Sequence, residues 1–542
     1  MTVDSAAVLA DPDIRTRAIR YRAWDEKVTS KAGYFKYKAG SWWSLILSFA
    51  LVMDGFYAIT ISSFYGQRQF QDRFGEVLSP GQPKAISAAW QSGLNNGSSV
   101  GSIIGLVITS WAADKYGVRP CMLFFFLWLI AMNFISVFAV NLPMLLVGNT
   151  LASIGTGSFQ TLTTTYASEV VPTVLRPYTT AWVCCAWGVG LTLSAGVIRA
   201  CLGLTGDWAW RLPFALQWIW PPVLFVVTWF APESPWNAIR RGRIDQARDA
   251  LRRLMSNPTE EEVDDNLAFI QHTSAMEKAT TASSTWWQCF KGTNLRRTEI
   301  NIFTWVIQIF CGNGIVGYAV VFLQAAGFDE DQAFNLNIAI FACQIVGGVL
   351  SWWFMAKLGR ATLYIGGQAG MFVCLMTIGV LGFVKQTDPV SLAIGILLIV
   401  STLINLTTTG PVCYPIVAET PSGPLRNKTI TIGRTGYLIA QILNNILTPR
   451  MISATEWNWA AKTGLFFAGT NLLLNIWSWF RLPETKGRTF GEIDLLFEHK
   501  VPARKFKYTK VDQFADHEVS RHIEEHPIHA DDKADLQMVE KV

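Results

Sequence analysis

The sequence contains few charged residues for its length. Asp, Glu, Lys and Arg make up 16% of its 542 residues, whereas 51% are hydrophobic, and soluble domains carry about 25% charged residues. The charges gather at the two ends, in one central block and in short junctions between long apolar runs. This distribution argues against a chain of roughly three or four soluble domains, the number that its length would allow.

Motifs for metal binding, redox chemistry and catalysis are also lacking. The nine cysteines include no C-x-x-C pair, and most lie in apolar runs, where small buried side chains are the simpler interpretation. Of the six histidines, His272 lies in the central block and the others follow from His499 onward, so no apolar run holds a histidine for a proton relay. We find no nucleotide-binding loop or nucleophile elbow, and we predict no enzyme, metal site or cofactor.

The apolar runs are the main feature of the sequence. About twelve are long enough to cross a hydrocarbon core about 30 Å thick, which needs roughly 20 residues per helix. Several contain Gly, Ser, Thr and Asn, which is typical of a bundle around a watery cavity. We therefore predict an all-α membrane protein. The runs centre near residues 42–65, 90–112, 121–140, 143–166, 178–201, 212–231, 301–323, 334–355, 363–384, 390–414, 430–450 and 463–481.

The longest polar interruption, residues 232–298, divides the runs into two sets of six. It is rich in Arg and Lys, as are the residues before the first run, and the positive-inside rule places both in the cytoplasm, together with the C-terminal tail. Such orienting charges explain the formal net charge of +5 better than nucleic-acid binding does. Within the block, residues 235–254 predict an amphipathic helix under the membrane. The predicted parts are a tail (1–40), a bundle (41–231), the central loop (232–298), a second bundle (299–482) and a tail (483–542).

The second run carries four glycines at a spacing of four residues: Gly93, Gly97, Gly101 and Gly105. Such a spacing places all four on one face of a helix, where the absence of side chains lets another helix approach closely. We interpret the stripe as a packing surface, not as a catalytic feature.

Short charged motifs end equivalent runs in the two sets. Glu169 is followed by Arg176, and Glu419 by Arg426 at the same spacing, which indicates the internal duplication of two-bundle transporters. We predict a cytoplasmic gate of charges that pair when the inner side closes; simple anchoring at the interface is the alternative, because an exposed pair contributes only about 0–1 kcal/mol. The predicted gate residues are Asp114, Arg119, Glu169, Arg176, Glu233, Arg360, Glu419, Arg426, Glu484 and Arg488.

These motifs resemble those of the sugar porters of the major facilitator superfamily. Pro-Glu-Ser-Pro at 232–235 and Pro-Glu-Thr-Lys-Gly-Arg at 483–488 look like that family's paired motifs, and residues 210–220, 410–414 and 485–498 are similar to the fungal maltose and α-glucoside permeases. The resemblance covers roughly residues 40–498. It implies about twelve helices in two six-helix bundles that alternately open a central cavity to either side, with helices 1, 4, 7 and 10 lining it.

The resemblance also implies site residues. Gln308, Asn313, Tyr318 and Tyr414 match positions expected to bind a sugar, which needs amides for its hydroxyls and rings for its apolar face. A helix–helix hydrogen bond would equally explain Gln308. Asp54 and Arg434 are charges inside apolar runs, so each is a functional candidate, and by the resemblance Asp54 is the candidate for the titrating group of a proton symporter.

Four positions depart from the family pattern and leave the function open. Tyr57, Ser102, Leu191 and Asn149 stand where polar or charged residues are usual in sugar porters. Three functions therefore stay open. The first is a transporter that takes up maltose, another α-glucoside or a hexose with protons. The second is an uncoupled facilitator or exporter of another metabolite, and the third is a sugar sensor. The expected partners are a small-molecule substrate, the lipid bilayer and protons, with no nucleic acid. We expect a monomer that spans the plasma membrane several times.

Overall fold

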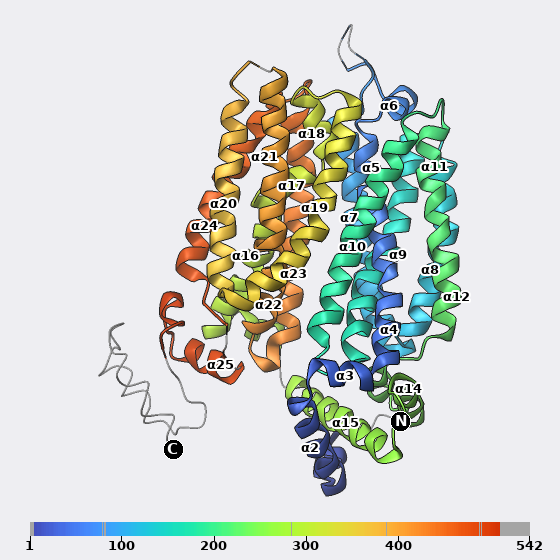
Figure 1. The fold of residues 1–542 in the computed structure, drawn as a ribbon, viewed down its shortest axis with the longest axis vertical. Coiled ribbons are helices and arrows are strands. Elements are labelled where there is room, and N and C mark those ends of the chain that lie inside the picture. Colours follow the sequence, from blue (N-terminus) through green and yellow to red (C-terminus); the bar gives the residue numbers. More distant parts are fainter. Residues whose placement is uncertain are drawn as a thin grey trace.

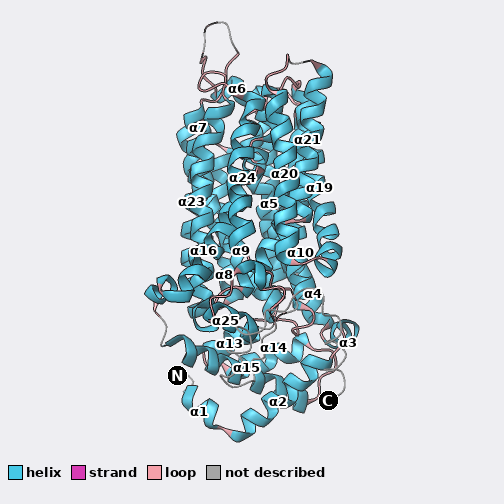
Figure 2. Ribbon diagram, turned by 90° about the vertical axis from the view of Figure 1, so that its left-hand side faces the viewer, coloured by secondary structure: helices cyan, strands magenta, loops and turns pink. Residues whose placement is uncertain are grey.

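The computed structural model describes residues 5–78, 80, 83–282, 285–385, 387–486, 488 and 490–509. Over these residues the chain is built from helices, and its β pairing is a single isolated bridge between Glu76 and Ala85. Long helices run side by side along the long axis of the molecule, and shorter ones gather at one end (Figures 1 and 2). We call that end, which carries α2, α14 and α15, the lower end, and the end that carries α6 the upper end.

Six rods form the first half of the bundle. The first is α4 and α5, which meet at Ser48, and the last is α11 and α12, joined by a 3-10 turn. Large apolar side chains such as Phe126 and Phe159 fill the space between the rods. The helices are α4 (Lys38–Leu47), α5 (Phe49–Phe64), α7 (Ala88–Tyr116), α8 (Val118–Val137), α9 (Leu142–Glu169), α10 (Arg176–Cys201), α11 (Trp208–Leu216) and α12 (Trp220–Phe230), with the short α6 (Arg68–Phe74) at the upper end.

Six further rods form the second half, so the predicted all-α fold of about twelve spanning helices in two sets of six is confirmed. Two of these rods are interrupted, which the sequence analysis did not anticipate. The helices are α16 (Gly292–Phe310), α17 (Asn313–Val316), α18 (Ala319–Ala325), α19 (Glu330–Lys357), α20 (Arg360–Leu381), α21 (Asp388–Thr407), α22 (Thr409–Glu419), α23 (Arg426–Ile452) and α24 (Thr463–Arg481).

The interruptions lie halfway along the two rods. Gly312 separates α16 from α17 with φ +114°, a conformation that L side chains rarely adopt. A Cβ atom there would also lie 2.4 Å from Leu375. Thr408 separates α21 from α22. Broken helices free backbone groups in the middle of a membrane bundle, which is where transporters bind their cargo.

Polarity divides the rods into two kinds. Among the described residues, six helical segments are long and apolar enough to cross a membrane by length and composition alone: Lys38–Phe64, Val118–Val137, Trp208–Phe230, Glu330–Met355, Arg360–Leu381 and Asp388–Glu419. The other rods carry more polar residues, and some of these bond across the bundle: Arg434 donates to Gln160, and Asn445 donates to Ser99. A segment that lines the interior of a bundle needs less hydrophobicity than one that faces lipid.

The glycine stripe packs α7 against α9, as predicted. A Cβ atom at Gly101 would lie 2.2 Å from the carbonyl oxygen of Thr150, and one at Gly105 would lie 2.1 Å from that of Ile154. At Gly93 the same atom would meet nothing within 4 Å. The close approach of the two backbones therefore depends on the lower three glycines.

The shorter helices form a layer across the lower end (Figure 2). The part predicted as an N-terminal tail contains three helices. The predicted single helix at 235–254 is wrong: Gly242, at φ +73°, separates two helices there. The helices of this layer are α1 (Ser5–Ala10), α2 (Pro12–Lys27), α3 (Ser30–Lys36), α13 (Pro235–Arg240), α14 (Ile244–Leu254), α15 (Glu260–Ala282) and α25 (Phe490–Glu498).

Helices α1–α3, which we call the N-terminal clamp, lie against α15. Lys36 pairs with Glu262 at 2.7 Å, and Arg17 pairs with Asp264 at 3.3 Å. Partial burial acts to raise the pKa of Glu262, but the hydrogen bond from Lys36 acts in the opposite direction, and on balance the pKa is lowered. Burial raises the pKa of Asp265, although the positive charge of the nearby Arg20 acts to lower it. These ion pairs thus help to attach the segment, together with the contact between the rings of Tyr21 and Phe269 at 5.1 Å.

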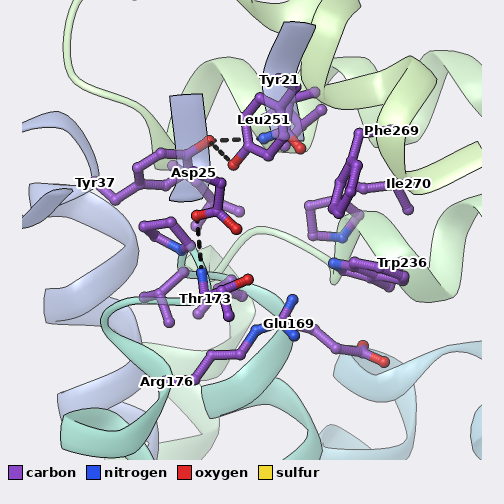
Figure 3. Close-up of a pocket in the computed structure, with 16 residues that line it drawn as sticks. Tyr21, Asp25, Tyr37, Glu169, Thr173, Arg176, Trp236, Leu251, Phe269 and Ile270 are labelled. Atoms are coloured by element: carbon purple, nitrogen blue, oxygen red, sulfur yellow. Dashed lines mark hydrogen bonds between the residues drawn. The ribbon is translucent and has the colours of Figure 1, made fainter. Parts of the chain in front are cut away.

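A buried polar chain ties the clamp to the first half. The hydroxyl groups of Tyr21 and Tyr37 lie 3.0 Å apart, and Asn266 donates to Tyr37 at 2.7 Å. Asp25 accepts a hydrogen bond from the backbone N–H of Thr173 at 3.1 Å, between α9 and α10 (Figure 3). The cavity among these residues measures about 20 Å³, which is room for about one water molecule. It is too small for a sugar.

Candidate functional site

Three polar residues form a bridge between the two halves, near the middle of the bundle. Asp54 on α5 is 3% exposed, and its Oδ2 accepts a hydrogen bond from Nε2 of Gln160 on α9 at 3.0 Å. The other end of the same amide, Oε1, accepts from Nη2 of Arg434 on α23 at 3.3 Å. The two charges predicted from the sequence are therefore joined through a residue that the sequence analysis missed.

Aromatic rings hold Arg434 in place on the second half. Its guanidinium carbon lies 4.7 Å from the ring centre of Trp305 and 4.5 Å from that of Tyr437. A cation over an aromatic face gains about 0.5–2 kcal/mol. Tyr414 contacts Trp305 edge to face at 5.4 Å. Its side chain is 52% exposed, and this contact places it beside Arg434, on the inner side of the second half.

The surroundings of Asp54 combine few polar groups with many apolar ones. Besides Gln160, the hydrogen bonds of Thr156 and Trp187 and the charge of Arg434 act on the carboxyl group. The buried hydroxyl of Tyr57 has no hydrogen-bond partner among the described residues.

The other departures from the family pattern lie in packing contacts. Leu191 is buried beside Phe341 of the second half, in a small apolar cluster. Asn149 donates to the backbone oxygen of Leu94 at 3.2 Å. The backbone of Ser102 lies so close to α9 that a Cβ atom at Gly157 would come within 2.6 Å of it. These positions therefore join helices together, and Leu191 makes the contact between the halves more apolar.

Gln308 lies at the two helix interruptions. Its amide nitrogen donates to the hydroxyl of Tyr364 at 3.1 Å and to the backbone oxygen of Thr409, the first residue of α22, at 3.2 Å. Tyr364 in turn donates to the backbone oxygen of Thr304 at 2.8 Å. Both amide hydrogens of Gln308 are thus engaged in helix–helix bonds. Asn313 begins α17 and is half-buried.

Tyr318 belongs to a buried network toward the upper end. Its hydroxyl accepts from Asn95 of the first half at 2.7 Å, and its ring stacks on that of Tyr65 at 6.4 Å. Tyr65 donates to Asn95 at 3.0 Å, and Asn445 of the second half donates to Ser99 at 3.3 Å. With 2% of its surface exposed, Tyr318 joins the halves instead of facing open space.

Charged residues reinforce this contact at the upper end. Arg199 of α10 pairs with Asp331 of α19 at 3.0 Å and donates to Asn335 at 2.8 Å. The backbone N–H of Arg68 donates to Glu330 at 3.0 Å. These contacts also escaped the sequence analysis, because their partners lie far apart in the chain.

At the lower end, the paired Pro-Glu motifs cap helices. Glu233 accepts hydrogen bonds from the backbone N–H groups of Val118 and Arg119, at 3.0 and 3.4 Å. In the second half, Glu484 accepts from the backbone N–H of Arg360 at 2.7 Å and of Thr362 at 3.4 Å. A carboxylate at a helix N-terminus satisfies free N–H groups and interacts favourably with the helix dipole. The motifs therefore fasten α8 and α20 in equivalent ways.

Two further acids of the predicted gate, Glu169 and Glu419, form ion pairs within their own half. Glu169 pairs with Arg240 at 2.9 Å and accepts a hydrogen bond from Ser234. Glu419 pairs with Arg360 at 2.8 Å. Each pair ties the end of a long helix to the next junction of the same half.

The other predicted gate residues have different surroundings. Arg176 lies over the ring of Trp236 at 5.6 Å (Figure 3). Arg119 donates to the backbone oxygen of Trp229. The side chain of Asp114 lies outside the described residues.

Two predicted gate residues of the second half also differ. Arg488 donates to the backbone oxygens of Phe506 and Thr509, at 2.5 and 2.6 Å, so that it fastens the segment after α25. Arg426 is the first residue of α23 and is half-buried.

The fold and the matching motifs define the class of protein. A family model described as "Sugar (and other) transporter" matches residues 43–497, and the chain belongs to this family. It is a multi-pass membrane transporter of the major facilitator type, and not an enzyme.

Two relatives from Saccharomyces cerevisiae are similar over most of the chain. The "General alpha-glucoside permease" of strain S288c is 38% identical over 517 residues, which are 94% of this chain and 84% of that protein. The "Maltose permease MAL31" is 38% identical over 485 residues, which are 88% of this chain and 79% of the relative.

Solved structures of similar fold include the xylose transporter XylE from E. coli. Its inward open conformation matches with a TM-score of 0.66 at 19% identity, over 84% of this chain and 98% of XylE. The proton:xylose symporter XylE bound to 6-bromo-6-deoxy-D-glucose matches with a TM-score of 0.68, at the same identity and coverage. This likeness concerns the fold.

Proposed function

We propose that the chain is a secondary-active transporter of sugars of the α-glucoside class, driven by symport of protons. The observation that carries this proposal is the bridge from buried Asp54 through Gln160 to Arg434. An acid in the middle of a membrane bundle is costly and is kept where it serves transport. The names of the permeases that share 38% identity support the class of cargo.

The substrate would lie between the bridge and the helix interruptions. Gln308, through its carbonyl oxygen, and Asn313 offer polar groups, and the half-exposed ring of Tyr414 offers an apolar face for a sugar ring. Tyr318 would contribute by closing the upper side of the site. Asp54 is the proposed titrating group, and Arg434 is its partner on the opposite half.

The conformation fits a state open toward the lower side. Hydrogen bonds join the halves in the middle and at the upper end, whereas Glu169 and Glu419 pair within their own halves. In the proposed cycle these lower charges exchange partners across the bundle when the lower side closes, and so act as a gate. The lower end with both termini would face the cytoplasm, because its layer is rich in Arg and Lys. We propose a monomer in the plasma membrane.

Uptake by purified protein in liposomes tests the proposal. The panel contains maltose, another α-glucoside, glucose and xylose, each with and without an inward proton gradient. We expect uptake of an α-glucoside that accumulates only with the gradient, and an Asp54→Asn variant that exchanges sugar without accumulating it. If uptake by the wild type does not depend on the proton gradient, the proposed proton coupling is wrong.

An uncoupled facilitator or exporter of a less hydroxylated metabolite is the second candidate. The observations that favour it are the apolar contact of Leu191 with Phe341 and the hydroxyl of Tyr57, which has no partner in the described part of the chain. The same liposomes distinguish it, because no sugar of the panel would then accumulate with the proton gradient, either in the wild type or in Asp54→Asn.

A further inference from the structure

We propose that Gln160 is a positioning residue that transmits the protonation state of Asp54 to Arg434, and so to the second half. This inference rests on the proposed proton coupling. It names the residue through which protonation of Asp54 affects the contact between the two halves. Gln160 belongs to the first half and is the described side chain that hydrogen-bonds both charges.

The chemistry of the two neighbours fixes the orientation of the amide. A guanidinium group only donates hydrogen bonds, so the atom of Gln160 that faces Arg434 must be the carbonyl oxygen. An ionised carboxylate only accepts, so the amide nitrogen must face Asp54. With Asp54 ionised, both bonds have a charged partner, which makes them stronger than neutral hydrogen bonds.

Protonation of Asp54 removes the reason for this orientation. The neutral carboxyl group carries a proton that it can donate, and the carbonyl oxygen of Gln160, whose amide already contacts Asp54, can accept it once the amide turns. The amide then either turns that oxygen toward Asp54 and leaves Arg434, or keeps its place with a weaker bond to a neutral acceptor. Either change loosens the connection between α9 and α23.

Arg434 does not follow Gln160 when that connection loosens, because Trp305 and Tyr437 hold its guanidinium group from the second half. The charged group that acts on Asp54 from another element is Arg434 of α23, while Thr156 of α9 and Trp187 of α10 add hydrogen bonds from the first half. Proton binding therefore weakens a contact between the halves and leaves each half intact. A rocking transporter needs this combination to couple a proton to a change of conformation.

A double-mutant cycle tests the inference. Gln160→Met keeps the length of the side chain without its hydrogen bonds, and Asp54→Asn keeps the shape of the carboxyl group without its titration. The readouts are α-glucoside accumulation under a proton gradient and α-glucoside exchange without a gradient, in the wild type, both single variants and the double variant. Thr164→Val is the matched control, since the Thr164 hydroxyl bonds only to the backbone of its own helix.

We expect Gln160→Met to lower gradient-driven accumulation about tenfold, the factor that corresponds to a loss of ~1.4 kcal/mol, while exchange changes less than twofold. In the Asp54→Asn background, which does not accumulate sugar, the same substitution should leave exchange as it is in Asp54→Asn alone, because residues that act through each other are not additive. Thr164→Val should behave as the wild type.

Two results would overturn the inference, and both can be distinguished from a failure of the proposed function. If Gln160→Met accumulates sugar as the wild type does, or if it lowers exchange as strongly in the Asp54→Asn background as alone, Gln160 transmits nothing from Asp54. If the wild type itself shows no gradient-dependent accumulation, the proposed coupling fails instead.

Discussion

Arg199 and Asp331 form an ion pair of 3.0 Å that joins the two halves at the upper end. If alternate opening moves the halves apart there, Asp331→Asn should favour the state that is open to the upper side. The pair is partly exposed, so we expect a shift of at most ~1 kcal/mol, or about fivefold in population. Distances between spin labels on the upper ends of α10 and α19 measure this shift.

The matched control for that experiment is Asp207→Asn. Asp207 pairs with Arg211 at 3.1 Å and with Arg73 at 4.0 Å, both inside the first half, so its loss removes ion pairs without separating the halves. Equal distance distributions for both variants would contradict a role of the upper pair in closure.

The Pro-Glu motifs lead to a prediction about stability. Replacing Glu484 by Ala removes the cap of α20, and loss of a helix cap costs about 0.5–2 kcal/mol. We expect a lower midpoint of thermal unfolding in detergent for Glu484→Ala and, by the equivalent geometry, for Glu233→Ala. The exposed Glu498 at the end of α25 supplies the control, Glu498→Ala. An unchanged midpoint for both capping variants would show that the motifs do not fasten these helices.

The sequence predicted the repeated architecture well, because hydrophobicity and local motifs are physical properties of single segments. Runs of about 20 apolar residues must become spanning helices, and the paired motifs around Glu233 and Glu484 revealed the duplication. The interruptions at Gly312 and Thr408 were not visible in the same way, since a helix break depends on the neighbours that satisfy its free backbone groups.

The site was only partly predictable for the same reason. Asp54 and Arg434 stood out as charges among apolar residues, but the link between them depends on which helices face each other. Gln160 lies in a run that also holds many Thr and Ser residues, and the available signal was its amide inside a membrane segment. The N-terminal clamp was missed because the ion pairs that attach it to α15 join residues far apart in the sequence, such as Lys36 and Glu262.

Substitutions along the glycine stripe should differ sharply by position. Gly105→Ala would place a Cβ atom 2.1 Å from the backbone oxygen of Ile154, so α7 and α9 would have to separate. Overpacking of this kind costs about 1–3 kcal/mol. Gly93→Ala meets nothing within 4 Å and serves as the control. We expect Gly105→Ala to lower the yield of monodisperse protein and its unfolding midpoint, and comparable values for both variants would contradict the packing role.

Acid should release the N-terminal clamp. The folded pKa of Glu262 lies below its ordinary value of 4.5, so the stabilisation by Lys36 is fully present above that value and is lost as the pH falls through the folded pKa. Because the Glu262 side chain is 43% exposed, screening limits the contribution to ~1 kcal/mol or less.

Distances between spin labels at the exposed positions Ile19 and Tyr116 report whether the clamp is docked. We expect Glu262→Gln to raise the undocked fraction at pH 7 up to about fivefold, and to equal the wild type once the pH is below the folded pKa of Glu262, where both side chains are neutral. Glu260→Gln is the control, because Glu260 pairs with Arg252 at 2.7 Å within the central helices and does not touch the clamp. If Glu260→Gln undocks the clamp as much as Glu262→Gln does, general loss of charge on α15, and not the Lys36 pair, controls its attachment.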